Sequence, residues 1–158
     1  MKRINILLIG ECGVGKTWVM KQIIKAKNMT LHYSMKTIVF IREGNLAIAG
    51  KYDNSTFEGT DRLSMAVMKD TDAYLKFLND YKVNGIFEGD RFTNSKFIDK
   101  AQPYIIKIKG NGSKGRELRG SNQTERHLKS IKTRVNNIKP HIEVESSSEA
   151  LKTILELI

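Results

Sequence analysis

The eight residues from Gly10 to Thr17 have the types and spacing of a phosphate-binding loop. They read GECGVGKT, which fits the pattern G-x-x-x-x-G-K-[ST]. In such a loop, backbone N–H groups point at phosphate oxygens, and the next helix adds the partial positive charge of its N-terminus. We expect Lys16 to reach the β- and γ-phosphates of ATP and Thr17 to bind Mg²⁺. The predicted nucleotide-binding residues of this loop are Gly10, Gly13, Val14, Gly15, Lys16 and Thr17.

The residues on both sides of this loop supply the context that the motif requires. Residues 4–9 are an apolar run typical of a buried strand, and apolar residues after Thr17 recur at helical spacing. Cys12 occupies a variable position of the motif, where a small filler is favoured over a nucleophile. Trp18 has two open interpretations, stacking on a base or packing in the core, of which packing is favoured.

A second group of candidates lies between residues 50 and 64. Gly59 permits a tight turn, after which Asp61 starts a predicted helix over residues 62–81. Asp61 is interpreted either as a general base that accepts a proton from a hydroxyl or as the N-terminal cap of that helix. Arg62 either binds a substrate phosphate or faces solvent.

A third group ends a predicted strand over residues 83–87. Glu88 follows this apolar run directly, so its carboxylate is predicted to hold Mg²⁺ or the waters of the ion near the loop. Asp90 is a second catalytic candidate and Arg91 a substrate-binding one. The alternative is that Asp90 and Arg91 pair with each other on the surface.

Most of the net positive charge lies in residues 107–139, which contain ten Lys or Arg residues and only two Glu residues. Asn122 and Glu125 are predicted to start a helix. Arg126 and Arg134 lie on one face of it, and glycines 110, 112 and 115 are expected to give the preceding stretch hinge-like freedom. We interpret residues 110–135 as a basic lid that closes over the triphosphate. A solvated basic face is the alternative.

The remaining pattern predicts an α/β fold. Strands are expected at residues 36–41 and 46–49, joined as a hairpin, and at 104–109 and 141–144. Helices are expected at 94–101 and after Ser146, which forms a capping box with Glu149. Alternating strands and helices after a phosphate loop predict the P-loop kinase type of fold, with a parallel central sheet covered by helices on both faces. Residues 1–158 are expected to form a single domain.

Composition limits the class of protein. The chain has 158 residues, one cysteine and a net charge of +10, which favours polyanionic partners. The apolar residues near the start are too few for a signal peptide, and no run is long enough to span a membrane, so we expect a cytoplasmic protein without membrane contact. A GTPase switch is disfavoured because the sequence contains neither D-x-x-G nor N-K-x-D. The sequence gives no indication of oligomeric state.

Three stretches together, GKYD with FEGTDRLSM, GIFEGDRF, and RELRGSNQTERHLKSIKTRVNNI, resemble small P-loop kinases of bacterial viruses. The similarity is greatest to DNA kinases that phosphorylate 5-hydroxymethyluracil in DNA. The resemblance implies ATP and Mg²⁺ as cofactors, transfer of the γ-phosphate to the hydroxymethyl group, and DNA as the partner. It implies that Asp61 is the base or substrate anchor, and that Glu88 and Asp90 form an acidic pair. The lid cations that it implies are Arg116, Arg119, Arg126 and Arg134.

The charge of the lid also argues for a polymer. A kinase for a free nucleoside has little use for such an excess of positive charge, whereas DNA contacts require it. Aromatic residues, Tyr52 above all, are candidates for stacking on a flipped base, although a role in the core is favoured. A nucleoside or nucleotide kinase with a small substrate remains the alternative function.

Overall fold

The computed structural model describes residues 2–53, 58–64, 66–119 and 123–158. The strands are β1 (Asn5–Ile9), β2 (His32–Met35), β3 (Ile38–Glu43), β4 (Leu46–Ala49), β5 (Asn84–Glu88), β6 (Tyr104–Ile108) and β7 (Ile142–Val144). The α-helices are α1 (Lys16–Ala26), α2 (Thr71–Asp80), α3 (Ser95–Ala101), α4 (Ser113–Arg119), α5 (Glu125–Asn136) and α6 (Ser147–Leu157). Two short 3₁₀ helices, η1 (Thr60–Arg62) and η2 (Val67–Asp70), precede α2.

The strands form a seven-stranded sheet in the order β2-β3-β4-β5-β1-β6-β7. Strands β4, β5, β1, β6 and β7 are parallel to their neighbours in that order, and β3 is antiparallel to both β2 and β4. The central strand β1 pairs with β5 on one side and β6 on the other. Their carboxyl ends therefore meet at one edge of the sheet, where ligands bind in open α/β sheets.

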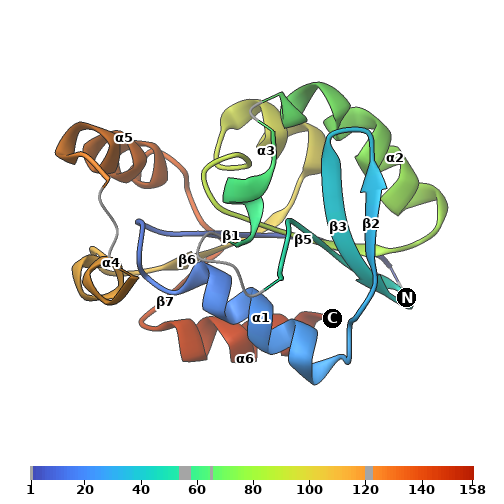
Figure 1. Cartoon of the computed structure of the whole chain (residues 1–158), viewed down its shortest axis with the longest axis horizontal. Helices are drawn as coiled ribbons and strands as arrows, with labels where there is room; N and C mark the ends of the chain where they lie inside the picture. The colour runs from blue at the N-terminus through green and yellow to red at the C-terminus, as the bar shows by residue number, and fades with distance from the viewer. Residues whose placement is uncertain (1, 54–57, 65, 120–122) are drawn as a thin grey trace.

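Helices cover both faces of this sheet, which confirms the predicted α/β fold (Figure 1). On one face, α1 and α6 pack on each other and on the buried residues Ile6, Leu8 and Ile106. On the other face, Leu7 and Phe87 pack in a cluster with residues of α2, α3 and α5. The side chains of β1 alternate between the two clusters while all five residues are buried, as expected for a central parallel strand.

Several local predictions are confirmed. The hairpin between β3 and β4 turns at Gly44, which has a φ of 55°. The helix expected at residues 94–101 is present as α3, and Asn94 caps it by accepting a hydrogen bond from Phe97 N at 2.8 Å. Ser146 caps α6 through Glu149 N at 3.2 Å, and the Glu149 carboxylate reaches back to accept from Glu145 N. No helix among residues 2–53, 58–64, 66–119 and 123–158 has the length and apolarity needed to cross a membrane.

The single helix predicted over residues 62–81 is wrong. The segment forms η1 and η2 before α2 starts at Thr71. Asp70 marks the junction of η2 and α2, and its carboxylate accepts hydrogen bonds from the backbone N–H and the hydroxyl of Thr37 in the turn between β2 and β3.

Two predictions about the basic segment also need correction. Of the glycines expected to give hinge-like freedom, Gly115 lies inside α4, whereas Gly110 and Gly112 precede the helix. The next helix starts at Glu125 with Thr124 as its cap, whose side chain accepts a hydrogen bond from His127 N at 3.2 Å. Asn122, predicted to start this helix, lies outside the described residues. Ile131 and Val135 of α5 are buried in the core.

Candidate functional site

The phosphate loop joins β1 to α1 at the carboxyl edge of the sheet. Gly13 and Gly15 have φ values of 93° and 103°, which only glycine adopts without strain, and Gly15 is the N-cap of α1. The Lys16 ammonium donates to the carbonyl oxygens of Gly10 at 2.8 Å and Glu11 at 3.1 Å, so it lies folded along the loop. A lysine held in this way is positioned to exchange carbonyl partners for phosphate oxygens.

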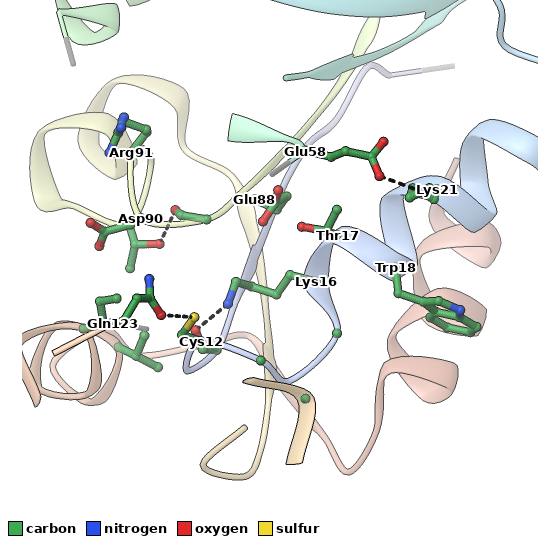
Figure 2. Close-up of a pocket in the computed structure, with 18 of the residues that line it drawn as sticks. Cys12, Lys16, Thr17, Trp18, Lys21, Glu58, Glu88, Asp90, Arg91 and Gln123 are labelled. Atoms are coloured by element: carbon green, nitrogen blue, oxygen red, sulfur yellow. Dashed lines mark hydrogen bonds and ion pairs between the residues drawn. The ribbon is translucent and has the colours of Figure 1, made fainter. Parts of the chain in front are cut away.

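Glu88 and Thr17 approach each other beside Gly59. Glu88 is 3% exposed, and a Cβ atom built on Gly59 would lie 2.5 Å from Glu88 Oε1 and 3.6 Å from Thr17 Oγ1. Two hydrogen bonds to Lys51 hold Gly59 in place, and Thr60 Oγ1 donates to the Glu88 carbonyl oxygen at 2.8 Å. Figure 2 shows Thr17 and Glu88 above Lys16. A carboxylate and a hydroxyl from different elements therefore converge next to the loop.

This oxygen pair fits magnesium. Mg²⁺ binds through one or two protein oxygens and completes its shell with water and substrate phosphates. Glu88 and Thr17 supply such oxygens next to a loop suited to phosphates. Among the residues that the structure describes there is no cluster of three or more His, Cys, Asp or Glu side chains that could enclose a metal by themselves. The donor set therefore suits an ion shared with a nucleotide.

Helix α4 packs directly on the phosphate loop. A Cβ atom on Gly115 would collide with the Gly13 carbonyl oxygen, and one on Gly13 would collide with Gly112 and Arg116. The Arg116 guanidinium donates to the Cys12 carbonyl oxygen at 2.8 Å. Gly115 thus allows close approach of two backbones, which corrects its predicted role as part of a hinge.

A cavity of about 600 Å³ opens above the loop. Its volume is within the range of small-molecule sites. The lining includes five of the predicted functional residues other than the loop glycines: Lys16, Thr17, Glu88, Asp90 and Arg91. The far wall is formed by α5 through His127, Ile131 and Val135. The phosphate loop, the carboxyl end of β5 and one face of α5 therefore line the same cavity.

Asp90 and Arg134 form an ion pair across this wall. Arg134 lies on α5, so the pair connects this helix to the segment that follows β5. The predicted alternative, a pair between Asp90 and Arg91, is wrong because Asp90 has a different partner. Arg91 lines the cavity, and its buried Nε has no hydrogen-bond partner in the described part of the chain.

Arg126 and Arg134 also line a shallow groove of about 430 Å³ on α5. Lys129 contributes a third cation to it, and Ser130, Thr133 and Asn137 complete the lining. Arg126 is exposed and lines this groove rather than the cavity. The lid cations are therefore divided between two places, with Arg116 on the phosphate loop and these two on the outer groove.

Other predicted residues lie apart from the cavity lining. Tyr52 is 9% exposed, and its hydroxyl donates to the Ala49 carbonyl oxygen at 3.2 Å, so it is part of the core. Arg62 forms an ion pair with Asp53 at 2.5 Å. The side chains of Asp61 and Arg119 lie outside the described part of the structure, and their roles stay predictions.

The cavity is also lined by residues that were not predicted to be part of the site. Lys21 on α1 forms an ion pair with Glu58 at 2.7 Å, and Cys12 Sγ lies 2.7 Å from Gln123 Oε1. Figure 2 shows these pairs on opposite sides of Lys16. Trp18 is 43% exposed and lines the cavity, which overturns the favoured prediction that it packs in the core. The spacing of Trp18 and Lys21 by three residues was the signal that places them on one helix side.

Comparisons with known proteins add a remote similarity to solved structures. No protein-family model matches the chain, and no curated protein matches it significantly. The crystal structure of shikimate kinase from Aquifex aeolicus is similar, with 20% sequence identity and a TM-score of 0.47. The similarity covers 97% of this chain and 95% of that one. A likeness this remote carries no argument about activity, so the functional assignment depends on the residues of the site.

Proposed function

We propose that this protein is an ATP-dependent phosphotransferase that uses Mg²⁺. The observation that carries the proposal is the convergence of Lys16, Thr17 and the buried Glu88 next to a glycine-rich loop at the carboxyl edge of the sheet. A loop of backbone N–H groups, a lysine and two oxygen ligands are the parts that phosphoryl transfer needs on the donor side. The adjoining cavity has room for an acceptor.

In the proposed reaction an acceptor hydroxyl oxygen forms a bond to the γ-phosphorus of ATP. The bond from that phosphorus to the bridging oxygen breaks, ADP leaves, and the hydroxyl proton passes to a base, for which Asp61 is the candidate. Lys16 offsets charge on the phosphate oxygens. Glu88 and Thr17 would hold Mg²⁺, which would neutralise further charge on those oxygens when bound. Helix α4, with Arg116, keeps the phosphate loop in shape.

The acceptor that we propose is the hydroxymethyl group of 5-hydroxymethyluracil in DNA. The resemblance of three stretches to viral DNA kinases supports it, and so does the excess of positive charge in residues 107–139. The groove on α5 lined by Arg126, Lys129 and Arg134 offers several cations to a phosphodiester backbone. Such contacts make binding fall steeply with salt concentration.

The second candidate is a kinase for a free nucleoside or nucleotide. The size of the cavity and the ion pair between Asp90 and Arg134 on its wall favour a compact acceptor. For a free substrate the cations on the outer side of α5 have no role in binding. The two candidates therefore differ in whether Arg126 and Lys129 affect the affinity for the acceptor.

One labelling experiment tests both candidates. Purified protein is incubated with γ-labelled ATP and either DNA containing 5-hydroxymethyluracil, unmodified DNA, the free nucleoside or its monophosphate. We expect label only in the modified DNA. Label only in the free compounds supports the small-substrate kinase, and ATP hydrolysis with no labelled acceptor contradicts both.

The base is tested with Asp61→Asn. This variant is expected to bind ATP normally and to transfer phosphate slowly, because an amide does not accept the hydroxyl proton. Full activity would exclude Asp61 as the base. Arg62→Ala is the neighbouring control, since it removes a side chain from the same 3₁₀ helix but keeps the carboxylate.

A further inference from the structure

One side of α1 places an exposed aromatic ring on the rim of the cavity. Trp18 is the only tryptophan of the chain and is 43% exposed. Lys21 and Gln22 follow three and four residues later, so the three side chains share a helix side, and all three line the cavity. Figure 2 shows Trp18 extending from the helix that also carries Thr17.

Trp18 is not needed to fill the hydrophobic core. The opposite side of α1 already fills that role, because Val19, Met20 and Ile23 are completely buried against the sheet. Trp18 instead lines the cavity directly after the phosphate loop and is 43% exposed. Indole rings in such positions stack on the faces of planar ligands, and stacking tolerates any base because every base has a π face.

We propose that Trp18 is a stacking platform for a nucleobase, with Lys21 and Gln22 beside it. The Gln22 amide offers both a donor and an acceptor to the edge of a base. Lys21, held by Glu58 at 2.7 Å, keeps a positive charge near the phosphates of the same ligand. The inference rests on the proposed function in that the loop must bind a polyphosphate for a base to lie in this cavity.

Two sources supply the same chemistry, the adenine of ATP and the base of the acceptor. Fluorescence distinguishes the adenine of ATP from the base of the acceptor, because Trp18 is the only tryptophan in the sequence and all indole emission comes from it. The ligands are magnesium ATP, magnesium tripolyphosphate, which has no base, and an oligonucleotide that contains 5-hydroxymethyluracil. Stacking quenches indole emission, whereas occupation of the phosphate loop alone does not place a ring on Trp18.

We expect quenching by a ligand that carries a base and none by tripolyphosphate, although tripolyphosphate competes with labelled ATP. Quenching by ATP assigns the platform to the donor. Quenching by the oligonucleotide but not by ATP assigns it to the acceptor. Unchanged emission with both ligands bound, as measured by equilibrium dialysis, overturns the inference and leaves the phosphotransferase proposal intact. If neither ATP nor tripolyphosphate binds, both proposals fail together.

Variants provide a second readout. Trp18→Leu is expected to weaken binding of the base-bearing ligand roughly tenfold and to leave binding of tripolyphosphate unchanged. Trp18→Phe retains an aromatic ring and is expected to keep most of the affinity. Tyr81→Leu is the matched control, because Tyr81 is a 67% exposed aromatic that is absent from the described cavity lining. Equal affinities of the Trp18→Leu variant and the unmodified protein for both base-bearing ligands would contradict the stacking role.

Discussion

The carboxylate of Asp90 and the guanidinium of Arg134 form an ion pair that joins the segment after β5 to helix α5. The two residues are 44 positions apart in sequence. Both were candidates for direct contact with substrate, and in this structure each is the partner of the other. The pair sets the position of the helix that forms the far wall of the cavity.

This relationship predicts energetic coupling. Asp90→Asn and Arg134→Ala should each destabilise the protein, and the double variant should lose less than the sum, by about 0.5–1 kcal/mol for a partly exposed pair. Urea unfolding of the four proteins measures this difference. The exposed pair Lys76–Asp80 is the control, with a smaller expected coupling. Strictly additive losses for Asp90 and Arg134 would show that the pair does not hold α5.

Lys16 provides a prediction on catalysis. Lys16→Ala removes a positive charge aimed at the phosphates, and we expect phosphoryl transfer to fall by a factor on the order of 10² or more. The rate is measured with γ-labelled ATP at saturating acceptor, and thermal unfolding checks that the fold is retained. Lys25→Ala, an exposed change at the other end of α1, should keep the normal rate. Near-normal turnover of Lys16→Ala would contradict the assignment of residues 10–17 as the loop that binds the phosphates of ATP.

The elements around these residues were largely predictable from sequence. Strand β4 and the cap Ser146 follow from apolar runs and capping chemistry, which depend on neighbours a few positions away. The phosphate loop is local in the same sense. Such features are visible in a sequence because the interactions that produce them lie within one turn or one strand.

Contacts between residues far apart in the sequence could not be predicted from local patterns. Gly59 and Glu88 belong to separate motifs, and only the fold brings them into contact. Helix α4 was missed because Gly115 disfavours a helix locally by about 1 kcal/mol, and the reason for the glycine is its contact with Gly13. Secondary-structure prediction from neighbouring residues fails where the residue type is determined by a contact with a distant part of the chain.

The contact between Gly59 and Glu88 predicts a change in metal dependence. In Gly59→Ala the new Cβ would lie 2.5 Å from Glu88 Oε1, so the carboxylate must move away from Thr17. We expect the Mg²⁺ concentration for half-maximal transfer to rise several-fold. Gly44→Ala is the matched control, since it has a similar positive φ but no atom within 4 Å of the added Cβ. It should lose about 1–2 kcal/mol of stability from backbone strain and keep its metal dependence.

Gly115 predicts how α4 and the phosphate loop depend on each other. Alanine favours a helix, but its Cβ would meet the Gly13 carbonyl oxygen, so α4 must shift from the loop. We expect Gly115→Ala to weaken ATP binding about tenfold and to raise hydrogen exchange in the loop. Lys114→Ala, which places the same residue at an exposed position of the same helix, is the control and should bind ATP normally. If both variants bind ATP equally well, the contact between helix and loop is not required.

Asp70 predicts a pH dependence of stability. The Thr37 hydroxyl and then the Thr37 backbone N–H hold the pKa of the Asp70 carboxyl below its usual value of 3.8. A lowered pKa stabilises the folded state above pH 3.8, and this contribution is lost as the pH falls through the lower folded pKa.

Thr37→Val removes the hydroxyl, so its urea midpoint should lie below that of the unmodified protein at neutral pH. The difference between the two urea midpoints should become smaller in acid, where the Asp70 carboxyl is protonated in both proteins. Thr153→Val, whose hydroxyl donates to a backbone carbonyl oxygen instead, should show a gap that does not change with pH. A constant gap for Thr37→Val as well would mean that the hydroxyl does not stabilise the charged carboxylate.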